Sequence, residues 1–242
     1  MSTRHYQVIT FDLDDTLWDM RPVLVNAEKA VRAWCDIHCP ELYREHNNER
    51  LMALRTTTVA KRPELRHQIS QLRIEVTREA LEQCGYSAAD ARQLAEDAFD
   101  VFIEARHQVT LFEHAEQCLS ALARHYRIGA LTNGNACVYR VGLGDYFDFA
   151  FRAEELNAAK PAPEPFLAVL DHSGTRADQW IHVGDHWEHD VQGAQNIGAD
   201  TIWVNSADAL WPGAEKPSAQ VRHIGEVVNA VEALERRRRS QH

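Results

Sequence analysis

The sequence predicts an α/β protein, a doubly wound parallel sheet with an inserted all-helical domain. After residue 110, short β-like runs alternate with helix-like runs, the pattern of a parallel sheet covered by helices. Residues 22–107 interrupt this pattern, because their apolar side chains recur at three- and four-residue steps and little there reads as a strand. We therefore expect residues 1–21 and 108–242 to form a core, and residues 22–107 to form a helical cap over it.

The insert is predicted to hold about four helices, two of which are the runs Val23–Cys35 and Leu51–Val59. A third has an apolar face at helical spacing, made by Leu65, Ile69, Leu72, Val76 and Ala80. Gly85 is a typical helix stop. Ser87, with Asp90 three residues later, is typical of a helix start, and this fourth helix continues to about Arg106.

The core elements follow from short apolar runs and the segments between them. The runs that predict strands are Tyr6–Phe11, Arg127–Leu131, Phe149–Arg152, Trp180–Val183 and Thr201–Val204. One helix is predicted at Glu113–His125, before the second strand, and another directly after that strand. Two more are predicted at Phe166–His172, behind a proline-rich turn, and at Val191–Ile197.

Composition excludes several classes of protein. With 36 acidic and 26 basic residues the net charge is −10, so a broad nucleic-acid surface is not expected. No apolar run approaches the length of a membrane span, and the N-terminus lacks a secretory signal, so we expect a cytoplasmic protein with a small-molecule partner. The five cysteines are interpreted as reduced thiols, and the Arg236–Arg239 run as a solvated helix end. Monomer and homodimer both stay open.

Three predicted strands are followed at once by residues with reactive or ligating side chains. Asp12, Asp14, Asp15 and Thr16 follow the first strand, Thr132 and Asn133 the second, and Asp185, with Asp190 five residues on, the fourth. Each group alone is compatible with a helix cap or a turn. The carboxyl ends of parallel strands meet at one edge of the sheet, so we expect the three groups to form one site.

This combination of side chains indicates phosphate chemistry. Several carboxylates in one cleft repel one another and need a cation, and oxygen ligands suit Mg²⁺. Of Asp12 and Asp14, one can attack phosphorus while the other donates a proton to the leaving alcohol and later takes one from water. Thr132 and Asn133 can hydrogen-bond the phosphoryl oxygens. A lysine could neutralise the charge of the transition state, and Lys160 is the candidate, although a loop lysine by itself is more often merely solvated.

Four runs, taken in order, resemble the motifs of the haloacid dehalogenase-like hydrolase superfamily: FDLDDTLWD (11–19), LTNGNA (131–136), Lys160–Pro161 and GDHWEHD (184–190). The resemblance implies a Rossmann-like core and a helical cap of the subclass inserted between the first two motifs. It implies that Asp12 is the nucleophile and a Mg²⁺ ligand, that Asp14 is the acid/base and lends its backbone carbonyl to the metal, and that Asp185 completes the metal site. Thr132 and Lys160 then bind the phosphoryl group, and Asp190 pairs with Lys160 or with a metal-bound water.

The dehalogenases of the superfamily usually lack a carboxylate at the position of Asp14, so its presence indicates a phosphatase. The runs DDTLWDMRPVL (14–24), TNGNA (132–136) and GLGDYFDF (142–149) resemble the riboflavin-pathway phosphatases, which act on 5-amino-6-(5-phosphoribitylamino)uracil and flavin mononucleotide (FMN). His186 departs from the pattern, since many relatives have a second acid directly after Asp185. Trp18 and Arg21, where the chain leaves for the cap, are candidate substrate contacts, or else hinge packing and a solvated side chain.

Other functions remain as alternatives. A broad sugar phosphate phosphatase, a phosphomutase and a 2-haloacid dehalogenase are the other enzymes to consider. A receiver-like phospho-switch also has an acidic pair, a threonine and a lysine at strand ends, although the large insert speaks against it, and a silent regulatory relative is a further option. His186, Glu188 and His189 also allow a zinc site, but pocket-lining histidines are the favoured interpretation.

Overall fold

The computed structural model describes residues 4–213 and 215–240. The chain forms two compact units: Met1–Asp19 with Thr110–His242, which we call the core, and Met20–Val109, which we call the cap. The sequence-based cap, residues 22–107, begins two residues later and ends two residues earlier than this unit. Within the described ranges, no helix combines the length and the apolar character needed to cross a bilayer.

In the described part of the core, six strands form one parallel sheet in the order β3-β2-β1-β4-β5-β6. They are β1 (Val8–Phe11), β2 (Arg127–Thr132), β3 (Phe149–Arg152), β4 (Trp180–Gly184), β5 (Asp200–Val204) and β6 (Ala219–Val221). The central strand β1 pairs with β2 and β4, and Phe11 lies opposite Ala130 and Val183. These three strands therefore end at the same edge of the sheet, where ligands of open α/β sheets bind.

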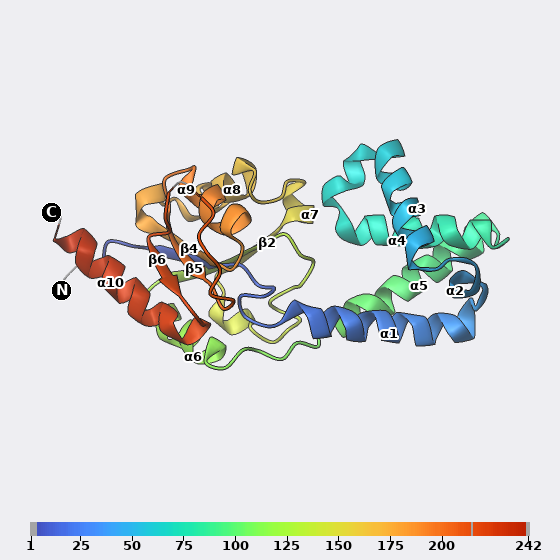
Figure 1. Cartoon of the computed structure of the whole chain (residues 1–242), viewed down its shortest axis with the longest axis horizontal. Coiled ribbons are helices and arrows are strands. Elements are labelled where there is room, and N and C mark those ends of the chain that lie inside the picture. Colours follow the sequence, from blue (N-terminus) through green and yellow to red (C-terminus); the bar gives the residue numbers. More distant parts are fainter. Residues whose placement is uncertain (1–3, 214, 241–242) are drawn as a thin grey trace. The chain divides into compact units, whose positions relative to one another are not determined.

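Helices cover both faces of this sheet, with α8 and α9 over one face and α6 and α10 over the other (Figure 1). The core helices are α6 (Ala115–Ala123), α7 (Ala153–Leu156), α8 (Pro163–Ser173), α9 (Gly193–Gln195) and α10 (Val227–Arg239). Every residue of β1 and β4 is buried, which explains why both strands are largely apolar rather than alternating. Arg238, in the terminal arginine run, pairs with Asp200 of β5.

The core departs from the sequence-based prediction at several places, one of which is the short helix α7, which no sequence pattern indicated. The helix expected after the second strand is wrong: between β2 and β3 the described chain has turns and a 3-10 turn at Gly144–Tyr146, and Gly142 has a left-handed φ of 83°. The segment predicted as a helix at Val191–Ile197 instead begins as a π-helical turn, Trp187–Gln192, that leads into α9. No pattern indicates β6, because three residues are too few to show a two-residue alternation.

The described part of the cap has five α-helices rather than about four. They are α1 (Met20–His38), α2 (Glu41–Glu45), α3 (Asn48–Lys61), α4 (Ile69–Gln83) and α5 (Ala88–Arg106). The short helix α2, after Pro40, is the one without a sequence signal. As predicted, α4 ends before Gly85, whose φ is 94°, and the Ser87 side chain accepts a hydrogen bond from the Asp90 amide at the start of α5. Small buried side chains at helical spacing, such as Ala27 of α1 and Ala91 and Ala95 of α5, belong to the core of the cap.

Candidate active site

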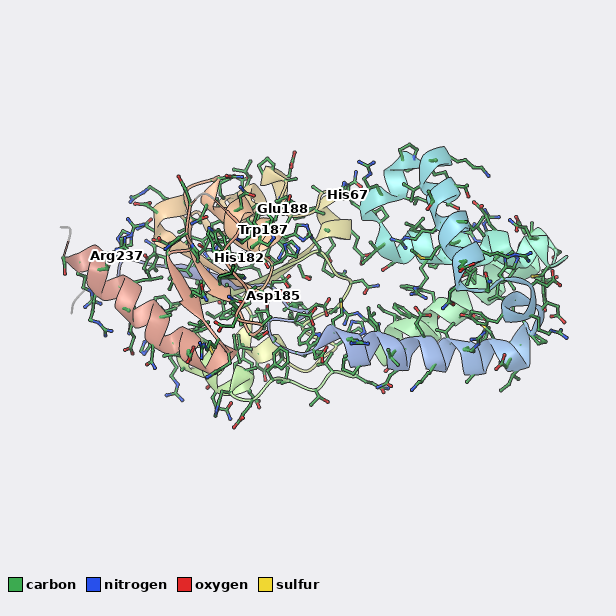
Figure 2. The ribbon with its side chains drawn as sticks, in the orientation of Figure 1. His67, His182, Asp185, Trp187, Glu188 and Arg237 are labelled. Carbon is green, nitrogen blue, oxygen red and sulfur yellow. The ribbon has the colours of Figure 1, made fainter. Side chains whose placement is uncertain are left out.

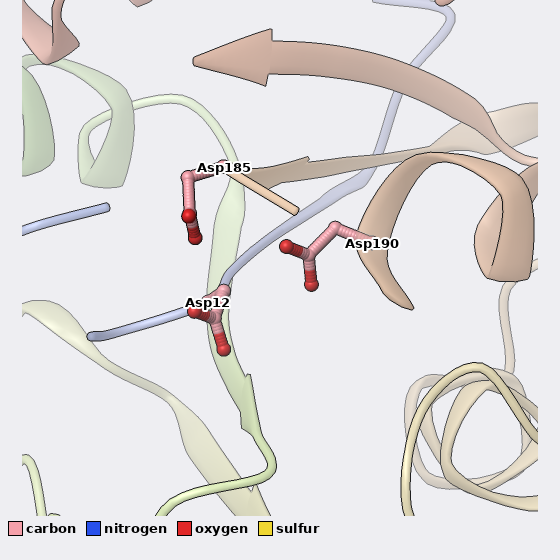
Figure 3. A group of neighbouring side chains, drawn as sticks. All are labelled: Asp12, Asp185 and Asp190. Carbon is pink, nitrogen blue, oxygen red and sulfur yellow. The ribbon is translucent and has the colours of Figure 1, made fainter. Parts of the chain in front are cut away.

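Three carboxylates converge at the carboxyl edge of the sheet. Asp12 follows β1, Asp185 follows β4, and Asp190 lies in the π-helical turn after it; one oxygen of each lies within 4.8 Å of the others. Figure 3 shows the three side chains turned toward a common space. The Asp12 amide donates to Val183 O at 2.9 Å, which extends the β1–β4 ladder and fixes where the Asp12 side chain begins. The strand topology therefore assembles these acids from opposite ends of the sequence.

Lys160 is the cation among them. Its Nζ donates to Asp12 Oδ1 at 2.8 Å, to Asp190 Oδ1 at 2.5 Å and to Leu131 O at 2.6 Å, and the residue is 3% exposed. Burial works against its charge, but Asp12 and Asp190 outweigh burial and raise the pKa of Lys160. Lys160 is therefore a fixed ammonium group directly beside the Asp12 carboxylate.

Asn133 holds this lysine in place. Its Nδ2 donates to Lys160 O and its Oδ1 accepts from Lys160 N, both at 2.8 Å. These two bonds use the Asn133 oxygen and one of the two Nδ2 hydrogens, so a second N–H is left and the phosphoryl contact of Asn133 stays a prediction. Thr132 is buried at the end of β2, and its Oγ1 accepts from the Gly134 amide at 3.1 Å, so its hydroxyl hydrogen is available to a ligand.

One ammonium group does not balance three carboxylates. Burial raises the pKa of Asp12, and Asp190 and Asp185 add to that effect while Lys160 opposes it. Burial, together with Asp190 and Asp15, raises the pKa of Asp185 to about 7. The pKa of Asp190 is lowered despite burial, because Lys160 and His182 favour its anion. Additional positive charge near Asp12 and Asp185 would therefore favour their ionised forms. Their donor set consists of oxygen atoms alone, which fits a hard divalent cation such as Mg²⁺.

The loop after β1 positions Asp14 through Trp18. The Asp15 amide donates to Trp18 O at 2.7 Å, and Asp15 has a left-handed φ of 59° that closes this turn. The Trp18 indole N–H donates to Asp14 Oδ1 at 2.8 Å. Trp18 is 0% exposed, which favours the hinge-packing alternative, and its contact with substrate stays a prediction. Arg21 is exposed in the first turn of α1, in the cap, and its substrate role stays a prediction.

A buried polar chain supports Asp190 from inside the sheet, and sequence reasoning did not find it. Trp180 Nε1 donates to Thr10 Oγ1 at 2.9 Å, Thr10 Oγ1 lies 2.7 Å from His182 Nδ1, and His182 Nε2 lies 3.2 Å from Asp190 Oδ1. His182, in β4, is labelled with Asp185 in Figure 2. A signal existed: polar Thr10 and His182 interrupt two apolar strands, and they are register partners.

This chain fixes the proton on His182. The Asp190 carboxylate only accepts, so His182 Nε2 carries the proton toward it. In the neutral ring Nδ1 is then the acceptor, and the Thr10 hydroxyl donates to it while also accepting from the Trp180 indole. Burial lowers the pKa of His182, although the Asp190 hydrogen bond opposes this shift. A neutral histidine therefore orients Asp190, which in turn holds Lys160.

Backbone groups complete the Asp190 site. The His186 amide donates to Asp190 Oδ2 at 2.9 Å. A Cβ on Gly184 would lie 2.3 Å from Asp190 Cγ, so only glycine allows this approach. The His186 ring faces His189 instead, with ring centroids 3.9 Å apart, and His186 Nδ1 accepts from the His189 amide at 3.2 Å. Among the described residues, the only cluster with metal-ligand spacing is the aspartate group, so the zinc alternative has no assembled site.

Comparisons with known proteins agree with this geometry. Residues 6–198 match the family described as haloacid dehalogenase-like hydrolase. The 5-amino-6-(5-phospho-D-ribitylamino)uracil phosphatase YigB of Escherichia coli K12 is 29% identical over 92% of this chain and 95% of its own length. The pyrimidine 5'-nucleotidase YjjG of the same organism is 31% identical over 53% of this chain and 60% of its own.

A solved structure is also close to this fold. The crystal structure described as a 2-haloacid dehalogenase from Pseudomonas syringae pv. Tomato DC3000 superposes with a TM-score of 0.92 at 40% identity, over 95% of this chain and 99% of that chain. The family match spans most of the sequence and includes Asp12, Lys160, Asp185 and Asp190. The chain therefore belongs to the haloacid dehalogenase-like hydrolase family.

Proposed function

We propose that this protein is a Mg²⁺-dependent phosphomonoester hydrolase that works through a phosphorylated Asp12. The general class, a phosphatase of the haloacid dehalogenase-like hydrolase family, rests on the family match and on the phosphatase-named relatives. The observation that carries the specific proposal is the Asp12 carboxylate, which lies 2.8 Å from the Lys160 ammonium group and within 4.8 Å of Asp185 and Asp190.

Asp12, Asp185 and the backbone carbonyl of Asp14 would hold the cation. When bound, Mg²⁺ supplies positive charge that keeps Asp12 ionised and offsets the charge of the substrate phosphate. The raised pKa values of Asp12 and Asp185 support this role, because a cation there would favour their ionised forms. Lys160 contributes a second, permanent positive charge beside Asp12, held by Asn133 and Asp190.

The reaction then has two steps, transfer of the phosphoryl group to Asp12 and its hydrolysis by water. In the first, an Asp12 oxygen forms a bond to phosphorus, the bond from phosphorus to the substrate oxygen breaks, and Asp14 gives its proton to that leaving oxygen. In the second, Asp14 takes a proton from water, the water oxygen bonds to phosphorus, and the bond to Asp12 breaks, which releases inorganic phosphate. The Thr132 hydroxyl donates a hydrogen bond to a phosphoryl oxygen in both steps. Lys160, whose three N–H groups bond Asp12, Asp190 and Leu131 O, supplies positive charge beside the phosphoryl group.

The alternative of a 2-haloacid dehalogenase has one specific support, the description of the solved structure at 40% identity. A halide leaves as a stable anion and needs no proton, whereas an alkoxide does. The Trp18 indole N–H orients the Asp14 carboxylate, which dehalogenation does not need as a proton donor. This arrangement favours the phosphatase.

For the substrate, we propose a phosphorylated pyrimidine or flavin, 5-amino-6-(5-phosphoribitylamino)uracil or FMN. The support is the similarity to YigB over nearly the whole chain, with the pyrimidine nucleotidase as a more distant relative. A sugar phosphate phosphatase and a phosphomutase use the same carboxylates and differ in what they bind or release.

The test is a release assay on the purified chain. Phosphate release is measured from both proposed substrates, from nucleoside monophosphates and from sugar phosphates, with Mg²⁺ or with EDTA, and halide release is measured from 2-chloropropionate. We expect Mg²⁺-dependent phosphate release with the highest kcat/KM on a ring-bearing substrate. Metal-independent halide release would overturn the phosphatase, and a preference for sugar phosphates would overturn only the substrate. A phosphate transferred to another hydroxyl of the sugar instead of released would indicate a mutase.

A further inference from the structure

The cap encloses a cavity that the proposed reaction does not use. Its volume is about 490 Å³, within the range of small-ligand pockets. All five cap helices contribute to its lining, and every lining residue belongs to Met20–Val109. The cavity is therefore a property of the cap alone, and none of its residues is among the catalytic carboxylates.

The lining carries an excess of positive charge. Lys29, Arg32, Arg55 and Arg73 face the cavity with a single carboxylate, Glu28. Of these four cations, only Arg73 forms an ion pair with a carboxylate of the described chain, and its partner is Glu28. Lys29 and Arg32 are exposed to solvent, whereas Arg55 is half-buried, so Arg55 is the cation of the cavity that lacks both full solvation and an acidic partner.

Arg55 is the residue where this excess is greatest. It lies on α3, is half-buried, and forms no hydrogen bond or ion pair with any residue in the described ranges. Burial, together with the nearby Arg73 cation, lowers the pKa of Arg55. Two guanidinium groups side by side repel each other, and an anion between them relieves that repulsion.

The other walls are apolar and aromatic. Tyr43 and Phe99 line the cavity together with aliphatic side chains such as Leu42 and Val76. The Arg32 guanidinium lies over the Tyr43 ring at 4.7 Å, which holds both groups at the cavity wall. A ligand for such walls needs a flat apolar body as well as a negative charge.

We propose that the cap cavity binds a small aromatic anion, a carboxylate, sulfonate or phosphate, whose charged group pairs with Arg55 and whose ring lies against Tyr43 and Phe99. This is a second binding site, separate from the catalytic carboxylates. A ligand bound in the cap cavity would take no part in the proposed phosphate-ester hydrolysis.

The test uses two fluorescent probes on the full chain. One is 8-anilinonaphthalene-1-sulfonate, an aromatic anion, and the other is N-phenyl-1-naphthylamine, its uncharged counterpart. We expect Arg55→Gln to weaken sulfonate binding by roughly tenfold, the loss of one charge-assisted hydrogen bond, while Arg55→Lys keeps most of the affinity. Arg92→Gln is the matched control, because Arg92 pairs with Glu96 on the exposed surface of α5, outside the cavity. The uncharged probe should bind Arg55→Gln and wild type equally.

Two further arms need no substitution in the cavity. Sulfonate binding to wild type should weaken as NaCl rises from 0.05 to 0.5 M, because salt screens the pairing, and the uncharged probe should not follow. Sulfonate binding should also persist in Asp12→Asn, which alters the catalytic carboxylates alone. Equal sulfonate affinity in Arg55→Gln and wild type, salt-independent binding, or loss of binding in Asp12→Asn would each overturn the proposal. None of these outcomes depends on whether the enzyme hydrolyses phosphate esters.

Discussion

The Trp18 indole N–H donates a hydrogen bond to Asp14 Oδ1 at 2.8 Å, from a ring that is completely buried. The two residues are four positions apart, and the turn at Asp15 brings them together. Because packing on all sides holds the buried ring in one orientation, the bond restricts where the Asp14 carboxylate points. In the proposed reaction this carboxylate must reach both the leaving oxygen and a water.

Trp18→Phe tests this relationship, because it keeps an aromatic ring and removes the N–H. We expect kcat for phosphate release to fall roughly ten- to hundredfold while KM changes little, since a hydrogen bond to a charged group is worth about 1.5–3 kcal/mol. Steady-state kinetics measures both constants. Trp34→Phe in the cap, where the ring stacks on His38, is the control for a general tryptophan effect. An unchanged kcat in Trp18→Phe would show that Asp14 is positioned without the indole.

Asp12→Asn should abolish turnover, by at least about three orders of magnitude, because an amide does not form the acyl phosphate. Phosphate release and thermal unfolding are measured on the same sample, so that loss of activity is separated from loss of fold. Asp15→Asn is a matched control in the same turn, since asparagine tolerates its left-handed φ of 59°. It should keep most of the activity. Near-normal turnover in folded Asp12→Asn would remove Asp12 as the nucleophile.

Mg²⁺ binding should weaken as the pH falls through 7. The pKa of Asp185 is raised to about 7, chiefly by burial, so below that pH a proton competes with the cation for this carboxylate. For one competing proton, the apparent Mg²⁺ dissociation constant should rise about tenfold between pH 8 and pH 6. Titration calorimetry at the two pH values measures it. In Asp185→Asn the affinity should be lower and nearly independent of pH over this range, and a wild-type-like dependence there would place the titration on another group.

His182 should be needed as a neutral hydrogen-bond donor rather than as a charge. His182→Gln offers an amide that can accept from Thr10 and donate to Asp190, so we expect it to keep much of the activity. His182→Phe leaves both partners unsatisfied, and we expect it to lose activity and about 1–3 kcal/mol of stability per unpaired group. Kinetics and urea unfolding of the two variants measure these effects. Equal damage in both variants would mean that ring packing, not the hydrogen bonds, is what matters.

The same histidine predicts a pH effect on stability. Its folded pKa is lowered, chiefly by burial, while in the unfolded chain it is about 6.5. The unfolded chain therefore binds the proton more readily, and the folded state loses stability as the pH falls below about 6.5. Between pH 7.5 and 5.5, His182→Gln should lose less unfolding free energy than wild type, by up to about 1.4 kcal/mol. If wild type and His182→Gln lost the same unfolding free energy between the two pH values, His182 would take up a proton in the folded state as readily as in the unfolded chain.

Local patterns sufficed for much of the fold. The apolar runs located five of the six strands in the described core, the helical period located the insert, and Gly85 and Ser87 marked helix ends, because each is a property of neighbouring residues. Spacing failed where the signal was too short, at β6 and α2, and where glycines near residue 142 replace a helix by turns.

For the site, the sequence by itself determined the kinds of groups present and the family they resemble: Asp12 and Asp14 after one strand, Asp185 and Asp190 after another, and Lys160 between. Only the tertiary structure decided what each side chain does. It placed Lys160 between Asp12 and Asp190, hydrogen-bonded Asn133 to the Lys160 backbone, buried Trp18 against Asp14 and put neutral His182 behind Asp190. The physical reason is that parallel pairing of β1, β2 and β4 joins segments more than 100 residues apart, and burial and charge between them exist only after that pairing.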